Sequence, residues 1–428
     1  MGALAIYRAV TGVAGPLMRL YLRRRVARGK EDPSRLPERR GIASAPRPEG
    51  ALVWVHAASV GEAQSVLSLV GRLLDMRAKV TVLVTSGTVT SASLMARRLP
   101  ARALHQYAPV DLSGWVRRFL AHWQPQLALF VESELWPNLI CETAARPCPM
   151  VLVNGRMSAR SFARWRRAPA AARALLGRFA LCLGQTAEDR DRFAALGAPH
   201  TDYVGNLKYS AAPLPADEAE LARLQGVVAA RPLWLAASTH PGEEELAAAA
   251  HELLAGKFPD VLTIIVPRHP NRGDEIEAML AARGLTVCRR STGRLPGPDD
   301  AVYLADTLGE LGLFYRLADI AFIGGSTGTL GGHNPLEAAQ LTCAILYGPD
   351  MANFRTVAAD LEAAEAALPV ADATALAAAV ARLLDDPEAR RRLANGARKV
   401  TAANAAALDN VVAALAPFLD ALPAAPGR

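Results

Sequence analysis

The sequence predicts an α/β protein made of two doubly wound domains, and three observations support this prediction. From residue 51 onward, short apolar runs alternate with amphipathic segments, which is typical of a parallel sheet covered by helices on both faces. The alternation lapses into a polar, Pro- and Ala-rich stretch over 205–232 and then restarts. A chain of 428 residues is long enough for about two to three domains, each with its own core.

The apolar runs are the expected strands. In the first half they are 51–57, 79–87, 126–134, 149–157 and 181–186, and in the second half 233–239, 262–270, 285–291, 301–307, 319–326 and 343–349. We therefore expect a first Rossmann-like domain over 31–207, a linker over 208–232 and a second Rossmann-like domain over 233–428. The end of the second domain, after about residue 370, is Ala-rich and reads as helices.

Composition and cysteine usage narrow the class of protein. The chain is 51% hydrophobic and 21% charged, which fits a globular protein and argues against wholesale disorder. Its five cysteines include no C-x-x-C pair. This pattern indicates scattered thiols in a reducing compartment and favours neither a disulfide framework nor a zinc knuckle.

The net charge of +7 is confined to one end of the chain. Residues 1–50 hold eleven of the 48 basic residues and four of the 41 acidic ones, so the remaining chain carries 37 of each. A neutral body disfavours nucleic acid as a partner, because nucleic-acid binding needs a basic surface on the domain itself.

Residues 1–30 are predicted to form an N-terminal membrane-anchoring helix. Positions 3–22 are apolar apart from Arg8, Thr11 and Arg19, and the two arginines are three helical turns apart on one stripe. An apolar helix with a basic stripe suits a membrane interface, although a helix packed on the protein's own surface remains the alternative. Because the positive charge follows the apolar stretch, a secretory signal is disfavoured and the next domain stays on the cytoplasmic side. Whether the segment spans or lies on the membrane stays open.

Polar residues gather where the expected strands end. Ligands of doubly wound sheets bind beyond the carboxyl ends of the strands, so two such domains facing each other would form a central cleft. The first half presents carboxylates at these ends, whereas the second half presents glycines, hydroxyls, arginine and histidines.

The stretch VHAASVGEAQ (55–64) follows the first strand and has two interpretations. Ser59-x-x-Glu62 has the form of a helix capping box, in which Glu62 satisfies backbone amides. Alternatively, Glu62 is a carboxylate directed at a substrate. A helix N-terminus is expected to lower the pKa of Glu62, which would leave it ionised at neutral pH.

Two further glutamates and a lysine join these candidates. Glu132 and Glu134 fall on one face of the strand at 126–134 by its period of two, and two buried acids need hydrogen bonds or water. A solvated strand end is an equally good interpretation of either glutamate alone. Lys208, in GNLK (205–208), could place a positive charge near a leaving phosphate.

The second half contains the signals for an anionic ligand. In GGSTGTLGGHNPLE (324–337) the glycines could bring backbone amides to a phosphate and Asn334 begins a helix, although Asn334-x-x-Glu337 can also be only a cap. Arg268 and His269 end one strand, and His240 and His333 lie near neighbouring strand ends. Their spacing does not support a zinc site.

Eight motifs in order resemble one family, the Kdo (3-deoxy-D-manno-octulosonic acid) transferases of lipopolysaccharide synthesis. They are HAASVGE (56–62), ESELWPN (132–138), NGRMSARS (154–161), GNLK (205–208), STHPGEE (238–244), PRHPNR (267–272), LGELGLFY (308–315) and GGHNPLE (331–337). The resemblance covers nearly the whole chain. The family usually has Thr where Ser133 stands, and Ala and Leu where Gly155 and Met157 stand.

The resemblance implies a GT-B glycosyltransferase on the cytoplasmic face of the inner membrane that moves Kdo from CMP-Kdo to the lipid A precursor lipid IVA with inversion. It implies Glu62 as the catalytic base and places transition-state stabilisation on Lys208 and on the strand carrying Glu132 and Glu134, without deciding between the two glutamates. It implies no metal and no other cofactor. The residues expected to bind CMP or substrate are Pro267, Arg268, His269, Leu308, Gly309, Glu310, Ser326, Asn334, Pro335, Leu336 and Glu337.

Two other functions remain as alternatives to Kdo transfer. One is a related GT-B transferase that uses a UDP-sugar. The other, from a different class, is a non-catalytic protein that binds a membrane surface.

Overall fold

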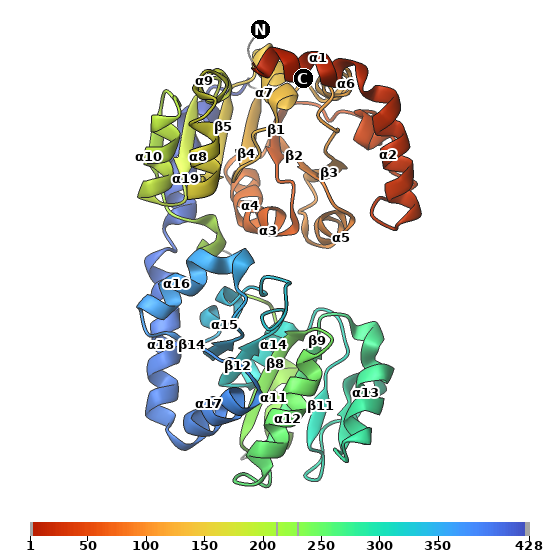
Figure 1. The fold of residues 1–428 in the computed structure, drawn as a ribbon, viewed down its shortest axis with the longest axis vertical. Coiled ribbons are helices and arrows are strands. Elements are labelled where there is room, and N and C mark those ends of the chain that lie inside the picture. Colours follow the sequence, from red (N-terminus) through yellow and green to blue (C-terminus); the bar gives the residue numbers. More distant parts are fainter. Residues whose placement is uncertain (1–2, 211–212, 229–230, 424–428) are drawn as a thin grey trace. The chain divides into compact units, whose positions relative to one another are not determined.

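The computed structural model describes residues 3–210, 213–228 and 231–423. The chain divides into two compact units, the first formed by residues 1–211 and 404–428 and the second by residues 212–403. Each unit contains a seven-stranded sheet in which every pair of neighbours is parallel, with helices on both faces (Figure 1). The predicted α/β class with two Rossmann-like domains is therefore confirmed.

The sheet of the first unit has the order β3-β2-β1-β4-β5-β6-β7. Its strands are β1 (Ala51–His56), β2 (Val80–Ser86), β3 (Ala103–Tyr107), β4 (Leu127–Val131), β5 (Met150–Gly155), β6 (Leu181–Gly184) and β7 (Thr201–Tyr203). All residues of β1, β4 and β5 are buried, which explains their unbroken apolar sequences, because a strand covered on both faces has no polar side.

Two apolar clusters cover the two faces of this sheet. The first involves α3 (Val60–Ser65), α4 (Leu67–Met76), α5 (Val89–Arg98) and α19 (Ala407–Asp420). The second involves α1 (Ala3–Val13), α6 (Ser113–Trp123), α7 (Pro137–Ala144), α8 (Ala159–Trp165), α9 (Pro169–Leu176) and α10 (Ala187–Ala195). The unit also contains α2 (Gly15–Ala27) and the short 3-10 helices η1 (Glu38–Arg40) and η2 (Leu207–Ser210).

The sheet of the second unit has the order β10-β11-β9-β8-β12-β13-β14. Its strands are β8 (Leu233–Thr239), β9 (Leu262–Pro267), β10 (Val287–Arg289), β11 (Val302–Leu304), β12 (Ile320–Ile323), β13 (Ala344–Tyr347) and β14 (Ala367–Pro369). Its helices are α11 (Glu218–Val228), α12 (Glu243–Ala255), α13 (Gly273–Ala282), α14 (Leu311–Leu317), α15 (Leu336–Gln340), α16 (Arg355–Ala363), α17 (Ala373–Asp385) and α18 (Pro387–Ala403), with η3 (Pro270–Arg272), η4 (Arg290–Thr292) and η5 (Ala352–Phe354).

The predicted domain boundaries need two corrections. The last helix, α19, belongs to the first unit and not to the second, because its apolar face (Val411, Val412, Leu415 and Leu419) is buried in the first unit's core. The segment expected to be a linker over 208–232 contains α11, which belongs to the second unit and packs on α14. Neither helix carries a sequence signal for the unit to which it belongs.

The predicted N-terminal helix over 1–30 is in fact two helices, α1 and α2, which meet at Ala14. Pro16 lies at the start of α2, and a proline cannot continue a helix because it lacks the amide hydrogen and its ring clashes with the preceding turn. The 11 residues of α1 extend about 16 Å, roughly half the hydrocarbon thickness of a bilayer. Met1 and Gly2 lie outside the described residues.

Polar contacts attach α1 to the first unit. Arg8 forms an ion pair with Glu142 on α7 (Nη2 to Oε1, 2.7 Å), and the Tyr7 hydroxyl donates to Asp111 (2.9 Å). Arg8 therefore faces its own domain, and the expectation of one basic stripe toward lipid is wrong for this residue. The exposed apolar side of α1 and α2 consists of Ile6, Val10, Val13, Leu17, Leu20 and Tyr21, and α2 also exposes Arg19, Arg23 and Arg24.

In the described ranges, one stretch is long and apolar enough to cross a membrane by length and composition alone, Pro387–Asp420. This stretch comprises α18 and α19. Because α19 buries five residues, its apolar character has an explanation in the core of the first unit.

Candidate active site

In each unit, several candidate residues follow the two strands between which the sheet reverses its strand order. In the first sheet the reversal falls between β1 and β4, which precede Glu62 and Glu132 respectively. In the second sheet it falls between β8 and β12, which lead to His240 and Gly324. Loops on either side of such a switch point leave in opposite directions and open a crevice, which is where ligands of doubly wound sheets bind.

Glu62 is a capping residue and a buried carboxylate at the same time. The Ser59 Oγ accepts a hydrogen bond from the Glu62 amide (3.3 Å), and the Glu62 carboxylate accepts from the Ala58 amide (2.8 Å) and from the Ser59 hydroxyl (2.7 Å). Only 8% of the residue is exposed. The two interpretations of this motif are therefore compatible, because capping fixes the position of the carboxylate without consuming all of its lone pairs.

The environment of Glu62 raises its pKa to about 7, and this overturns the expectation of a lowered value. Burial is the largest cause, followed by the negative charges of Glu134 and Glu132, and together they outweigh the hydrogen bonds from Ser59 and Ala58. A helix terminus favours a negative charge, but desolvation and like charges disfavour it more strongly here. The result is a carboxyl group balanced between its two protonation states at neutral pH.

Glu132 and Glu134 do not share a strand face, contrary to the prediction. Strand β4 ends at Val131, and Glu132 has a left-handed backbone with φ of 55°. The turn sends the two side chains to different partners. Glu132 forms an ion pair with Lys208 (Oε1 to Nζ, 2.9 Å), whereas Glu134 accepts a hydrogen bond from Trp136.

The position of Lys208 depends on a chain of contacts that starts at Asn154, the penultimate residue of β5. The Asn154 side chain accepts a hydrogen bond from the Leu207 amide (2.9 Å), and its carbonyl accepts from the Gln185 side chain (3.1 Å). Asn206 in turn accepts from the Lys208 amide (3.0 Å). GNLK is thereby attached to the strand ends of β5 and β6, which brings Lys208 to Glu132.

His56 lies at the end of β1 as a buried, neutral side chain. Its pKa falls to about 3 because of burial and, secondarily, the charge of Arg39. The Thr85 hydroxyl lies 2.9 Å from both the His56 Nδ1 and the Trp54 Nε1. Since the indole can only donate to Thr85, the hydroxyl is free to donate to Nδ1. The other ring nitrogen, Nε2, lies 3.7 Å from the Glu134 carboxylate.

Backbone strain concentrates at these strand ends. Of the six non-glycine residues with positive φ in the described ranges, three lie there: Glu132 (55°), Asn154 (52°) and Ser238 (57°). Such conformations are costly for residues with a Cβ and persist where surrounding contacts impose them, often at functional sites.

In the second unit, Arg268 and His269 follow β9 as exposed side chains, and Pro267 is the last residue of that strand. The His240 ring stacks on His333, with centroids 5.1 Å apart and Nε2 atoms 2.9 Å apart, and meets the edge of His269. One of the two close nitrogens must be an unprotonated acceptor. Burial, Arg268 and the other histidines lower the pKa of His333 to about 4, so its ring is neutral.

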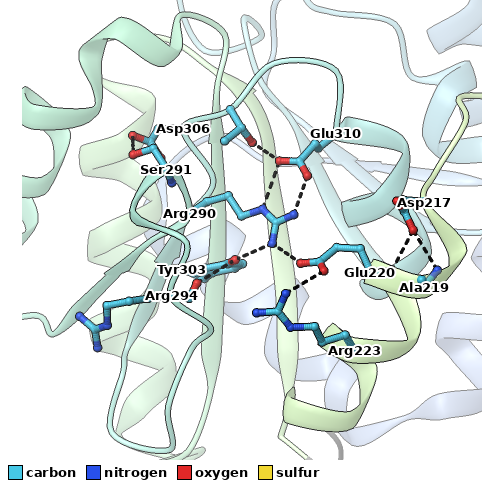
Figure 2. A network of polar contacts seen from close by, with 11 residues as sticks. Asp217, Ala219, Glu220, Arg223, Arg290, Ser291, Arg294, Tyr303, Asp306 and Glu310 are labelled. Atoms are coloured by element: carbon cyan, nitrogen blue, oxygen red, sulfur yellow. Dashed lines mark hydrogen bonds and ion pairs between the residues drawn. The ribbon is translucent and has the colours of Figure 1, made fainter.

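Glu310 follows the neighbouring strand β11 and is held by Arg290 (Figure 2). The guanidinium donates to both carboxylate oxygens of Glu310 and also binds Glu220 of α11 and the Tyr303 hydroxyl. The hydrogen bond from Arg290 keeps the pKa of Glu310 below its usual range. The same loop contains Leu308, whose side chain is 71% exposed, and Gly309, whose φ of 88° favours glycine.

The glycine-rich loop 324–337 does not present its amides as predicted. The amides of Gly325, Ser326 and Thr327 donate to Glu243, and the Gly331 amide donates to Asp350. The amides of Gly332 and His333 donate to carbonyls within the loop. These groups already have acceptors inside the protein, so the loop does not offer them to a phosphate.

The remaining predicted residues of this loop contribute mainly to its own structure. The Ser326 hydroxyl donates to the Ile323 carbonyl (2.5 Å) and accepts from the Gly348 amide (2.8 Å). Asn334 accepts from the Leu336 amide (3.1 Å) and donates to Glu337 (3.4 Å). Pro335 precedes α15, and Leu336 is buried. Binding of CMP by these residues stays a prediction.

Sequence reasoning missed two organising residues, Glu243 and Arg290. Glu243 is one of three successive glutamates at the start of α12, and only the tertiary structure distinguishes it from Glu244 and Glu245. Arg290 lies in an Arg-Arg-Ser segment that resembles a solvated loop. In the residues that the structure describes, no three His, Cys, Asp or Glu side chains converge as metal ligands would.

Two doubly wound units of this kind make up the GT-B fold. A solved glycosyltransferase from Rickettsia africae has this fold: 87% of the present chain and 99% of that structure superpose with a TM-score of 0.56 at 12% identity.

Residues 34–211 match the family described as 3-deoxy-D-manno-octulosonic-acid transferase (kdotransferase). A 3-deoxy-D-manno-octulosonic acid transferase from Bordetella pertussis is 37% identical over 96% of the chain and 98% of the relative. One from Rickettsia bellii is 37% identical over 86% of the chain and 87% of the relative. The chain belongs to the Kdo transferase family and is a glycosyltransferase.

Proposed function

We propose that this Kdo transferase takes Kdo from CMP-Kdo and attaches it to lipid IVA with inversion at the anomeric carbon. The observation that carries the proposal is the placement of Glu62, a buried carboxyl group with a pKa of about 7 at a strand-order reversal. A general base works best when its pKa lies near the working pH, because it is then both available and strong enough to take a proton.

In this reaction the ionised Glu62 accepts the proton of an acceptor hydroxyl. The hydroxyl oxygen forms a bond to the anomeric carbon of Kdo, and the bond from that carbon to the phosphate oxygen breaks. The electron pair of the broken bond leaves with CMP. No covalent enzyme intermediate forms.

Glu132 and Lys208 would balance the charges that develop during transfer. The sugar ring becomes positive as the bond to the phosphate breaks, and the phosphate oxygen becomes negative. The pair offers one charge of each sign, 2.9 Å apart, in a partly buried setting where such charges act more strongly than in water. Their mutual contact and Asn154 keep the lysine in place before substrate arrives.

The donor carries two negative charges, a phosphodiester and a carboxylate. In the second unit, Arg268 supplies a positive charge, and His269, His240 and His333 supply ring N–H donors. An exposed guanidinium binds such oxyanions in bidentate fashion. The residues Leu308–Glu310 and 334–337 are proposed to hold the CMP moiety.

The acceptor is proposed to reach the enzyme from the cytoplasmic face of the inner membrane. Lipid IVA carries acyl chains, and the exposed apolar side of α1 and α2 would rest on the lipid that contains it. Contact with the interface fits these two helices better than a span, because neither is long enough to cross the hydrocarbon core.

The test is to incubate the purified chain with CMP-Kdo and lipid IVA and to measure CMP release together with the mass of the lipid product. Addition of Kdo to the lipid is the expected result. Turnover with a UDP-sugar and none with CMP-Kdo would identify the related GT-B alternative. Lipid binding without turnover of either donor would favour the non-catalytic alternative.

A further inference from the structure

The carboxylate of Glu243 fills a ring of backbone amides in the second unit. Its Oε2 accepts from the amides of Gly325 (2.6 Å) and His240 (3.0 Å). Its Oε1 accepts from the amides of Ser326 (2.9 Å) and Thr327 (3.1 Å) and from the Thr327 hydroxyl (3.0 Å). Only 2% of Glu243 is exposed. Five donors on one buried carboxylate make it the centre of this loop.

Successive amides that converge on one point form a nest, an arrangement that usually binds an anion such as phosphate. Here the anion is part of the protein. A Cβ on Gly324 would lie 2.9 Å from the Glu243 carboxylate and 2.6 Å from a backbone carbonyl, so the approach also requires a glycine at that position. Glu243 is also the first residue of α12, and the helix dipole stabilises a negative charge at that end.

Helix capping does not account for Glu243. The capping role at the start of α12 belongs to Glu245, which accepts from the Gly242 amide (2.9 Å). Glu244 has another task, since it pairs with Arg272 (2.8 Å) and accepts from the Thr239 hydroxyl. The three adjacent glutamates thus have three separate functions, and only Glu243 reaches the glycine loop.

Glu243 also links two parts of the proposed donor site. Through the His240 amide it fixes the loop after β8, and through the other amides it fixes the loop after β12. The Gly325 carbonyl then accepts from the Gly332 amide (2.8 Å), next to His333, whose ring stacks on His240. Removing the carboxylate would release both loops and with them the histidine pair.

We infer that Glu243 is a positioning residue for donor binding. Its carboxylate occupies the amide nest in place of a phosphate, and side chains bind the anionic groups of the donor. This inference rests on the proposed function, in which the second unit binds CMP-Kdo. The nest is permanent in this arrangement, and the phosphate of the donor is bound by Arg268 and the neighbouring histidines. The contrasting arrangement has Glu243 move away so that the phosphate enters the nest.

Amide hydrogen exchange in the unaltered full-length chain separates the two arrangements. If Glu243 holds the nest permanently, the amides of Gly325, Ser326 and Thr327 are protected before ligand is added, and saturating CMP changes their exchange little. Rapid exchange without CMP, followed by protection when CMP is added, would overturn the inference. If the chain does not bind CMP at all, the proposed function is contradicted. The exchange of these three amides in the ligand-free protein still tests whether Glu243 holds the nest.

Two substitutions of Glu243 supply the second test. In Glu243→Gln, an NH₂ group replaces one acceptor oxygen and faces backbone N–H donors. Because this mismatch loosens the loops that position the donor site, the dissociation constant for CMP should rise at least about tenfold. Glu245→Gln is the matched control on the same helix turn and should bind CMP within about twofold of the original chain. Unchanged or tighter CMP binding by folded Glu243→Gln would overturn the inference.

Glu243→Ala allows a rescue experiment. The vacated nest should accept a small carboxylate, so added formate should restore CMP affinity to Glu243→Ala and leave the unaltered chain unchanged. A residue with a merely structural role would lower the melting temperature without this specific recovery. Restored folding without restored CMP affinity in formate would count against a role in donor binding.

Discussion

Lys208 and Glu132 form an ion pair in which Nζ lies 2.9 Å from Oε1, and each side chain is less than 15% exposed. The pair joins the end of β4 to the segment after β7. Of the two glutamates between which the sequence did not decide, it is Glu132 and not Glu134 that contacts the lysine. Partly buried charges in direct contact act as a unit, so removing either one leaves the other uncompensated.

We predict that Lys208→Met and Glu132→Gln each lower kcat by about a hundredfold, as loss of a charged group at a transition state does. The double substitution should cost less than the two effects combined, with a coupling of about 1–3 kcal/mol. Steady-state kinetics of the four chains measure this coupling. Arg72→Met, which removes an exposed ion pair with Asp409, is the control and should leave kcat unchanged. Fully additive effects would show that the two residues work independently.

Glu62→Gln should separate activity from stability. The amide can accept from the Ala58 amide and donate to Ser59, so the cap survives, while transfer should fall by about a hundredfold to ten-thousandfold.

The same substitution should stabilise the fold at alkaline pH. In the folded chain the pKa of Glu62 is about 7 against the ordinary 4.5, so holding it ionised costs about 3 kcal/mol. This cost is absent below pH 4.5 and fully present above pH 7. Chemical denaturation at pH 4.5 and pH 8 should therefore show a stability gain for Glu62→Gln only at pH 8. An equal gain at both values would contradict a raised pKa.

The rate of transfer should depend on pH through the same carboxyl group. Because the base must be ionised, kcat/KM is expected to rise with pH with a midpoint near 7. Glu134→Gln removes a neighbouring negative charge that raises the pKa of Glu62, so the midpoint should move to lower pH. Initial rates across pH 5 to 9 measure both profiles. A midpoint that moves upward in Glu134→Gln would contradict this assignment.

Arg290 is predicted to support CMP binding through Glu310. Arg290→Lys keeps a positive charge but cannot bind Glu310, Glu220 and the Tyr303 hydroxyl together, because the planar fork of donors is lost. We expect the dissociation constant for CMP to rise about tenfold, which corresponds to one broken charged contact. Calorimetric titration with CMP measures it. Arg294→Lys, at an exposed arginine near Asp300, should behave like the unaltered chain. Unchanged affinity for CMP in Arg290→Lys would show that the contact between Arg290 and Glu310 does not support donor binding.

The exposed apolar side of α1 and α2 should determine membrane association. Val10→Asp and Leu17→Asp place charges where 61% and 74% of each side chain is exposed, so the fold should persist. Binding to anionic vesicles, measured by co-sedimentation, should fall about tenfold or more, because each charge opposes burial in the interface. Leu253→Asp, at an exposed leucine of α12, is the control. Point substitutions are preferable to deletion, since Leu22 of α2 is buried against Trp115. Equal vesicle binding by all chains would place the membrane contact elsewhere.

Sequence reasoning recovered the central strands and missed three of the four edge strands. All eleven predicted strands are present, and the three that the sequence did not predict, β3, β7 and β14, each lie at the edge of a sheet. An edge strand is covered less completely and needs no unbroken apolar run; β7, for example, has two exposed residues of three. An apolar run reports burial, so it detects a strand most readily where burial is complete.

The sequence by itself determined the α/β class, the two sheets and the identity of Glu62 as a candidate, because apolar periodicity and local capping depend on nearby residues. The tertiary structure decided the raised pKa of Glu62, the pairing of Glu132 with Lys208 and the return of α19 to the first unit. It also decided that the glycine-rich loop binds Glu243. Each of these depends on burial or charge contributed by residues distant in the chain. A local sequence pattern contains no information about which distant group will contact a given residue in the fold.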